Sequence, residues 1–568
     1  MAVLAALLLV ALVPLTTYVF SLLRYKSKTG GTAPSAPHWI ALIAHTAAFV
    51  KGDEALARVL RQSAIPGAMV RFHGLGFNFV LLSGADFIRK ALSTHNFDWN
   101  KVTAPLFAHM FAGPPHVVDA IARDDSGVGR KPYPGSSVPP GRRLLRNQIV
   151  FFADAFSRAS IDGMVPRFVS SLQAWCEKNT AIGANWVEMD DLYGFVREML
   201  FACGVESFFG PGMLEVNPGL AAAFWAYDDN MPFLAAGMPG WMKPRAARSR
   251  TVCHEAMKRW RAHAVEHTDP KVPEDAAWDS AWGLGAIRRR NKLLDEAEGL
   301  FDENARAAMD LALLWTLATN VIPASYWYLV EVLAHSGLAD RVRRETDKEL
   351  GPTTTTISSK GVQENAFLPA SNLDARKLTA NPLLQSIYAE TLRLHVATLL
   401  IRTVKKAHSL GAWNLPHDES ILVSSHVEHF GEQWDHQPDN DSDSSNTHDQ
   451  QEHHPATQFW PERFLVPSSS SADEDHGDEK PPGVKFKFSL SGRQGQWLPF
   501  GLGEHMCPGR HFAKQEMILS ASILLALFDV ELRAPPPAND FARYGFGTLG
   551  PKGKLPFRVR RRVGCGGQ

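Results

Sequence analysis

The sequence has few cysteines and no excess of charge of either sign. Five cysteines in 568 residues form no CxxC pair, which excludes a disulfide scaffold and argues against a structural zinc site or a thioredoxin-like centre. Basic and acidic residues number 59 each, so the basic excess expected of a nucleic-acid-binding protein is missing, and no nucleic-acid partner is expected. The cysteines are Cys176, Cys203, Cys253, Cys507 and Cys565.

Motifs of several other enzyme classes are also missing. The sequence contains neither a GxSxG motif nor a P-loop lysine motif, so the hydrolase and NTPase classes lack support. Gly545 to Gly550 satisfy GxGxxG, but Pro551 and Gly553 prevent the helix that a dinucleotide-binding fingerprint requires. This segment is interpreted as a turn near the end of the chain.

What the sequence does contain is ordinary globular composition, with 45% hydrophobic and 21% charged residues. Long helical patterns dominate, and short strands are expected in 66–82 and beyond Ile401. The sequence predicts a mainly α protein with small β-sheets (α+β), formed by one large catalytic domain, 38–568. Polar low-complexity stretches inside it are interpreted as surface insertions. The helical patterns are 142–171, 190–209, 245–267 and 303–336, and the insertions are 351–360, 435–458 and 467–483.

The N-terminus is interpreted as a membrane anchor. Residues 2–23 contain no charge, and this length suits a single crossing of the hydrocarbon core. Arg24, Lys26 and Lys28 follow at once, which places the rest of the chain in the cytosol by the positive-inside rule. We therefore expect a single-pass transmembrane segment at 1–23 and a basic, Pro- and Gly-containing hinge at 24–37. The alternative is a cleaved signal peptide, but the apolar run is too long and no basic residue precedes it.

One cysteine stands in a chemically distinctive segment, 497–516 (WLPFGLGEHMCPGRHFAKQE). Cys507 lies in a glycine-rich loop that leads into a predicted helix, and a helix N-terminus with free amides stabilises a thiolate. The glycines, Gly503 among them, allow the backbone to approach a large flat group, and Phe500 could shield the sulfur. A single thiolate without neighbouring ligands suits a haem iron. The alternative is an unligated, buried cysteine in an ordinary turn.

The segment resembles the haem-binding loop of the cytochrome P-450 family. The pattern FxxGxxxCxG followed by RxFA is satisfied in full, from Phe500 through Cys507 to Ala513. His505 stands where the family usually has arginine, and it still offers a donor to a haem propionate. The resemblance implies the P-450 fold and heme b, with Cys507 as the axial thiolate and metal ligand and with Phe500, Gly503 and His505 as further cofactor-binding residues.

Three further features extend the resemblance along the chain. Glu390 and Arg393 form an ExxR pair, and Arg463 in FWPERF would complete a buried triad that supports the haem-side core. Read alone, the ExxR spacing is that of a common surface ion pair. Arg402 resembles the family's propionate-binding arginine on a strand.

The expected distal helix departs from the family's usual AGx(D/E)T pattern. Its acid and threonine are replaced by Ile322 and Pro323, and Pro323 should kink the helix. Asn320 is the candidate catalytic residue over the iron, because it is the only strongly hydrogen-bonding side chain expected there. This helix and 543–560 resemble the branch that contains sterol 7-hydroxylases and prostacyclin synthase.

The resemblance implies a membrane-bound monooxygenase of the endoplasmic reticulum. NADPH electrons would arrive through a separate NADPH-cytochrome reductase, and Arg142, Arg143, Arg146, Arg510 and Lys514 could dock it. The alternative for these residues is a solvated cationic surface. The substrate would be a lipophilic small molecule, such as a sterol, a terpenoid or another secondary metabolite, and the insertions suggest a fungal source. Two alternatives stay open: a haem-thiolate isomerase or lyase that acts on a peroxide without reductase, and a non-catalytic haem carrier.

Overall fold

The computed structural model describes residues 2–41, 43–94, 96–350, 374–435, 454–468 and 486–562. The expected insertion at 351–360 lies outside these ranges, as do most residues of the insertions expected at 435–458 and 467–483. The prediction of surface loops there therefore stays a prediction.

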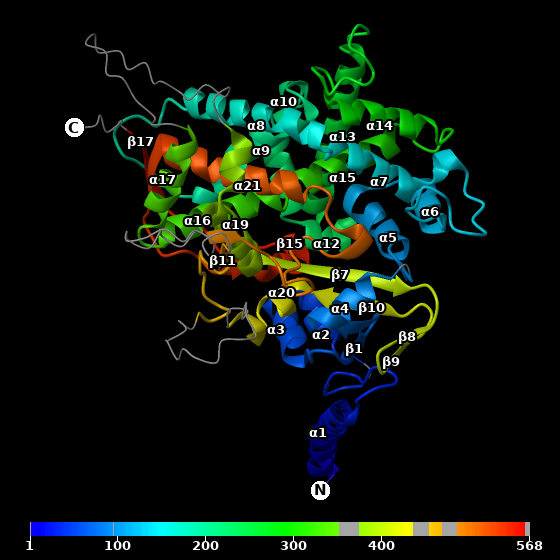
Figure 1. Ribbon diagram of the computed structural model, residues 1–568. Coiled ribbons are helices and arrows are strands. Elements are labelled where there is room, and N and C mark those ends of the chain that lie inside the picture. Colours follow the sequence, from blue (N-terminus) through cyan, green and yellow to red (C-terminus); the bar gives the residue numbers. More distant parts are fainter. Residues whose placement is uncertain are drawn as a thin grey trace, which may run out of the picture.

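Helices form the larger part of the molecule, in the upper half of Figure 1, and confirm the mainly α class. The predicted helical patterns correspond to α7 with α8, to α9, to α13, and to α15 with α16. The first helices are α1 (Ala2–Ser27), α2 (Thr46–Lys51), α3 (Glu54–Ser63), α4 (Ala85–Leu92), α5 (Asn100–Phe111), α6 (Pro115–Arg123), α7 (Leu144–Ala155) and α8 (Arg158–Lys178). The next are α9 (Leu192–Phe209), α10 (Gly212–Glu215), α11 (Leu220–Asp228), α12 (Met231–Ala235), α13 (Pro244–Glu266), α14 (Gly285–Asp295), α15 (Glu303–Ala318) and α16 (Val321–Ala334). The last are α17 (Leu338–Leu350), α18 (Ala375–Ala380), α19 (Pro382–His395), α20 (Ser425–His429) and α21 (Arg510–Leu527), with 3-10 turns η1 (Pro140–Arg142), η2 (Gly240–Met242), η4 (Glu432–Trp434), η6 (Gly503–His505) and η7 (Phe541–Arg543).

The sheets are small and lie mainly below the helices in Figure 1. The largest has the order β1-β2-β10-β7-β15, with β3 paired to β7, and β10 runs parallel to β2. Its strands are β1 (Met69–Gly74), β2 (Phe77–Leu82), β3 (Phe97–Asp98), β7 (Val396–Val404), β10 (Ser420–Ser424) and β15 (Phe546–Thr548). The other strands are β4 (Val187–Met189), β5 (Trp278–Asp279), β6 (Gly283–Leu284), β8 (His408–Leu410), β9 (Trp413–Leu415), β11 (Leu465–Pro467), β12 (Phe486–Phe488), β13 (Phe528–Leu532), β14 (Asn539–Asp540), β16 (Gly550–Pro551) and β17 (Phe557–Arg561).

The predicted long helix after residue 303 is interrupted. α15 ends at Ala318 and α16 begins at Val321. Pro323 explains the position of the break, because its ring lacks an N–H and clashes with the carbonyl four residues earlier, that of Thr319. The kink predicted from Pro323 is therefore present, one turn before the proline itself.

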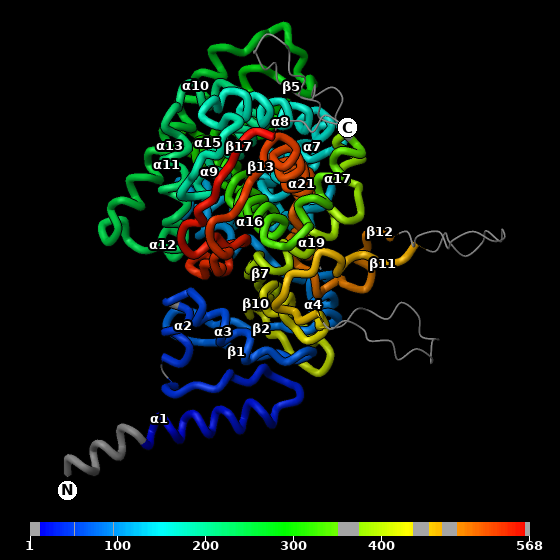
Figure 2. Tube along the Cα trace, turned by 90° about the vertical axis from the view of Figure 1, so that its left-hand side faces the viewer, coloured from blue at the N-terminus to red at the C-terminus, as the bar shows by residue number. Residues whose placement is uncertain are grey.

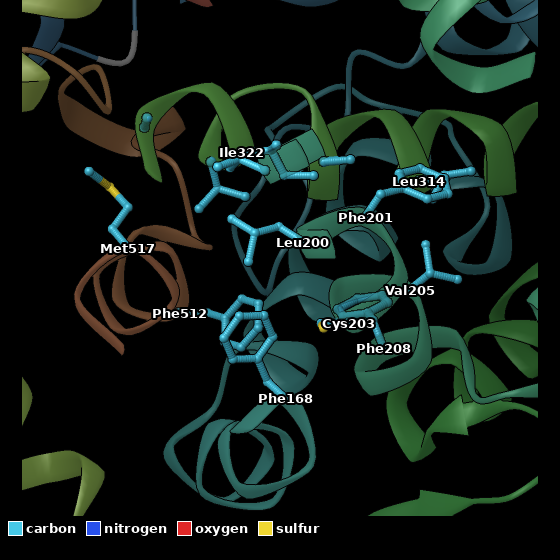
Figure 3. Packing of buried hydrophobic residues seen from close by; sticks show 14 of the residues in the cluster. Phe168, Leu200, Phe201, Cys203, Val205, Phe208, Leu314, Ile322, Phe512 and Met517 are labelled. Atoms are coloured by element: carbon cyan, nitrogen blue, oxygen red, sulfur yellow. The ribbon is translucent and has the colours of Figure 1, made fainter. Parts of the chain in front are cut away.

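One hydrophobic core joins the helices that surround α16. Figure 3 shows Phe512 of α21 against Phe168 of α8, with Leu200 of α9 and Ile322 of α16 nearby. The rings of Phe168 and Phe512 meet edge to face, with centroids 6.2 Å apart. This packing fixes α21, and thus the loop in front of it, against the main body of the protein.

The N-terminal helix α1 extends to Ser27, so the first residues of the expected hinge are helical. Its second half lies on the rest of the protein: Tyr18 stacks on Trp39, and the Tyr25 hydroxyl donates to the Ser63 carbonyl at 2.8 Å.

Among the described residues, one helical stretch, 303–334, is long and apolar enough to cross a membrane. About two thirds (67%) of its most apolar window is buried inside the protein, as expected of a core helix.

Candidate active site

Cys507 stands between η6 and the first turn of α21. Its backbone N–H donates to the Phe500 carbonyl at 2.9 Å, which folds 500–507 into a closed loop. The loop is tied down from outside, because the His429 Nε2 accepts from the Leu498 N–H at 2.9 Å. Cys507 is partly exposed, whereas the three other cysteines of the described chain are buried in the hydrophobic core. Cys507 is therefore the described thiol most accessible to a bound group.

Two opposing effects act on the Cys507 sulfur. Burial raises the pKa of the Cys507 thiol, and hydrogen bonds from the Gly509 and Arg510 amides, with the Arg510 charge, lower it. The amides lower the pKa as expected from the helix N-terminus, but burial has the larger effect and the pKa of the thiol is raised. A coordinated metal ion deprotonates a thiol outright, and the two amides then stabilise the anion.

The glycines of the loop permit a close approach of backbone to backbone. Gly503 has φ +77°, and a Cβ there would lie only 2.3 Å from the Leu92 carbonyl oxygen. Gly501 also has a positive φ, +73°. A side chain at Gly503 would force the loop away from α4, so this glycine has a steric reason, whereas Gly501 is favoured by its positive φ alone.

Arg402, Trp99 and His505 form a cluster beside this loop. The Arg402 guanidinium lies 5.3 Å from the Trp99 ring centroid, and the Trp99 and His505 rings are 4.8 Å apart. Burial lowers the pKa of Arg402 to about 10, and no carboxylate of the described chain forms an ion pair with it. Burial, together with the charges of Arg402 and Lys405, lowers the pKa of His505 to about 4, and its Nδ1 is buried without a described partner. The cluster thus offers buried donors to an anion.

The Glu390–Arg393–Arg463 triad is present and fully buried. The Arg393 Nε and Nη2 each donate to a Glu390 carboxylate oxygen at 2.8 Å, and the Arg463 Nε donates to Glu390 Oε1 at 2.9 Å. Burial alone would raise the pKa of Glu390, but the two arginines hold it below its usual value. Arg393 also donates to the His429 carbonyl, which connects the triad to the residue that holds the cysteine loop.

Asn320 lies in the break between α15 and α16. Its Oδ1 accepts a hydrogen bond of 2.9 Å from the Thr548 N–H in β15. Gly547 has φ +125°, and a Cβ there would lie 1.9 Å from the same oxygen. The amide oxygen is therefore committed to the C-terminal loop, and the end that remains available for other groups is the NH₂.

Three comparisons with known proteins agree on one family. The family model described as Cytochrome P450 matches residues 444–557. The chain is 31% identical over 540 residues to the cytochrome P450 monooxygenase efuG of Hormonema carpetanum, over 93% of this chain and 90% of that protein. It is 30% identical to the cytochrome P450 monooxygenase fsoE of Humicola fuscoatra, over 93% of this chain and 87% of that protein.

The chain belongs to the cytochrome P450 family. It is also 26% identical over 388 residues to the cholesterol 7-alpha-monooxygenase of Cricetulus griseus, over 66% of each chain, which supports the sterol 7-hydroxylase-like branch. The structure of a retinoic acid-bound cyanobacterial CYP120A1 shares the fold, with a TM-score of 0.59 and 18% identity over 94% of this chain and all of that one.

The predicted family, enzyme class and cofactor are thereby confirmed. The protein is a P450 monooxygenase whose family binds haem through a cysteine thiolate and takes electrons from a redox partner. The relatives named as monooxygenases do not favour the alternative of a reductase-independent peroxide isomerase. The relatives from Hormonema and Humicola agree with the expected fungal source.

The residues of the site fit a haem. Arg402 is a buried cation without an acidic partner in the described chain, and His505 Nδ1 is a buried polar atom without one, so both suit haem propionates. The sulfur that would meet the iron accepts hydrogen bonds from two backbone amides. Sequence motifs did not indicate Trp99, which holds both donors, because a tryptophan distant in sequence from the cysteine leaves no local signal.

The five basic residues expected to dock a P450 reductase differ in how far they are exposed to solvent. Arg142 is exposed, but Arg143 is buried and donates to four backbone carbonyls between Ser126 and Arg130, so its expected docking role was wrong. The other three are partly buried, and each donates a hydrogen bond within the protein. They are Arg146, Arg510 and Lys514.

Proposed function

We propose that Cys507 is the residue that ligates the haem iron in this monooxygenase. The observation that carries the proposal is the pair of amide hydrogen bonds from Gly509 and Arg510 to a partly exposed sulfur at the start of α21. Haem supplies the activation of molecular oxygen and the insertion of one oxygen atom into the substrate. Phe500 lies in the same loop, where its ring meets the Trp497 ring at 5.9 Å and would help to exclude water from the sulfur.

Arg402 and His505 would hold the haem propionates. Arg402 remains a cation at neutral pH even with its lowered pKa of about 10, whereas His505, with a pKa of about 4, is neutral and donates from one ring nitrogen. Trp99 lies against both side chains, with its ring tilted relative to that of His505, and would set their direction. Gly503 allows the loop to lie close to α4 on the same side.

Asn320 would position a water molecule or the substrate near the reacting centre. Its oxygen is held by Thr548, so the NH₂ group is directed by a fixed amide rather than by a freely rotating side chain. An amide cannot itself supply a proton at neutral pH, and protons must therefore come from water or from a substrate hydroxyl.

The substrate would be a lipophilic small molecule, such as a sterol, a terpenoid or another secondary metabolite. The electrons would come from NADPH through a separate NADPH-cytochrome reductase.

The charge-free run at 2–23 would anchor the protein in the endoplasmic reticulum membrane with the catalytic domain, 38–568, in the cytosol. The hinge at 24–37 would connect the two.

The substrate proposal is tested by comparing the lipophilic metabolites of a producing strain with and without the gene. The accumulated compound is then incubated with the purified enzyme, the reductase, NADPH and ¹⁸O₂. The proposal predicts one ¹⁸O atom in the product and no product without NADPH. A product that forms without reductase or that contains no ¹⁸O would contradict it.

A further inference from the structure

Asp228, Trp315 and Arg543 form a largely buried polar cluster, to which α15 contributes Trp315. Asp228 ends α11 and is fully buried, and its Oδ1 accepts from the Trp315 Nε1 at 2.9 Å. Its Oδ2 accepts from the Arg543 Nη1 in η7. Three segments far apart in sequence therefore meet at one carboxylate.

Arg543 uses only part of its hydrogen-bonding capacity. Its side chain is 15% exposed, and its Nε and Nη2 are buried without an acceptor in the part of the chain that the structure describes. Buried polar groups in proteins are nearly always hydrogen-bonded, and a buried unpaired donor is costly. In this guanidinium group only Nη1 donates to a carboxylate. The other two nitrogens are therefore suited to donate to an acceptor atom of a ligand.

Two segments of the chain connect the cluster to Asn320 over a short distance in sequence. Trp315 precedes Asn320 by five residues on α15, and Arg543 precedes Thr548, the hydrogen-bond partner of Asn320, by five residues. α12 contacts both η7 and α5, as Figure 2 shows for α12 and the red C-terminal segment, and Phe111 of α5 packs edge to face on Trp315 at 5.9 Å. These contacts connect η7, which contains Arg543, through α12 to α5 and Trp315.

We propose that the free Nε and Nη2 donors of Arg543 bind a neutral oxygen, a hydroxyl or a carbonyl, on an otherwise lipophilic substrate. This inference rests on the proposed haem site, because it concerns the orientation of a substrate above it. Bound at this oxygen, an apolar molecule would be fixed in one orientation, which determines the carbon presented for oxidation.

The balance of charge favours a neutral oxygen over a carboxylate. Asp228 pairs with Arg543, and the neighbouring Asp229 pairs with Arg197 at 2.7 Å, so the two acids and two bases cancel. Burial raises the pKa of Asp228 in spite of Arg543, so the surroundings of this carboxylate already tolerate negative charge poorly. An additional carboxylate would leave one buried anion without a partner, whereas a hydroxyl or carbonyl adds no charge.

The test uses two series of imidazoles bearing alkyl or ω-hydroxyalkyl chains of eight to sixteen carbons. The imidazole nitrogen coordinates the haem iron and shifts the Soret band, so affinity is measured without turnover. In the wild-type holoenzyme we expect the hydroxyl to improve binding, relative to the alkyl chain of equal length, over a narrow range of lengths. In the double variant Asp228→Asn/Arg543→Met, which removes both charges of the pair together, this advantage should fall roughly tenfold or more.

The matched control is Glu531→Gln/Arg558→Met, which removes an ion pair between β13 and β17. It should leave the ratio of the two affinities unchanged. The inference would be overturned if the affinity gained from the hydroxyl did not depend on chain length. It would also be overturned if this gain persisted in the Asp228/Arg543 variant. If no imidazole shifted the Soret band of the wild-type protein, the haem site itself would be wrong, and this inference with it.

Discussion

Asn320 and Thr548, 228 residues apart, are joined by one hydrogen bond of 2.9 Å from the Thr548 N–H to the Asn320 Oδ1. The bond fastens the C-terminal strand β15 to the break between α15 and α16. Gly547 beside it has φ +125° and leaves no room for a side chain. A family position that usually concerns proton delivery thus has a structural partner in this chain.

We expect Asn320→Leu to lower product formation per NADPH and to raise peroxide release. It should also lower the free energy of unfolding by ~1–3 kcal/mol, because the Thr548 N–H loses its acceptor. Asn320→Asp is the matched variant, since its carboxylate still accepts from Thr548 but has no NH₂ group. If Asn320→Leu remains fully coupled, with NADPH use, peroxide and product measured together, Asn320 only holds the loop.

The buried triad predicts a large loss of stability on removal of one member. Arg393→Ala should lower the free energy of unfolding by ~3–5 kcal/mol and produce mostly haem-free protein, because Glu390 would stay buried with incomplete pairing. Arg341→Ala is the control, since it breaks a half-exposed pair with Glu462 and should cost at most ~1 kcal/mol. Urea unfolding and haem content measure both, and equal losses in the two variants would contradict the structural role.

Arg142 is exposed and the adjacent Arg143 is buried, so the two should respond differently in electron transfer from the reductase. Arg142→Glu should slow reduction by the reductase, most strongly at low salt, because Arg142 is exposed. Arg143→Glu should instead destabilise the fold, since it removes a donor to four backbone carbonyls. Arg58→Glu on α3, with a side chain 61% exposed, is the control and should leave the rate unchanged. A reduction rate of Arg142→Glu equal to wild type at every ionic strength would exclude docking at this residue.

Glu428 predicts a pH dependence of stability. Burial raises its pKa to about 7, although the Gly84 N–H at 3.1 Å opposes the shift. Between the unfolded pKa of ~4.3 and about 7, the folded protein keeps the proton that the unfolded chain has lost. Stability should therefore fall as pH rises through this window and be level above it.

Glu428→Gln should remove this penalty. At pH 8 we expect the free energy of unfolding to rise by ~3 kcal/mol, and at pH 4 by little, because both states of the wild type are then largely protonated. Urea unfolding at the two pH values measures the difference, with the exposed Glu531→Gln as the control. A gain of equal size at both values would show that Glu428 is not the titrating group.

The sequence was most informative where chemistry depends on short spacing. The FxxGxxxCxG loop, the Glu390–Arg393 pair and the break caused by Pro323 are all local, so residue type and spacing predict them. Long-range partners were not predictable in this way. Nothing near Cys507 in sequence indicates Trp99, and the burial of Arg143 depends on carbonyls of a loop that the helical pattern does not reveal. Burial, which raises the pKa of the Cys507 thiol against the effect of the helix N-terminus, is likewise a property of the fold and not of the loop sequence.

The central claim is that the Cys507 thiolate ligates the haem iron, and the spectrum of the reduced carbon-monoxide complex tests it most directly. The wild-type protein should show the red-shifted Soret band of a thiolate-ligated haem, and Cys507→Ala and Cys507→His should both lose it. Cys253→Ala, a change in a cysteine buried in the core, should keep the band. A Cys507→Ala protein that binds haem and retains the red-shifted band would contradict the assignment.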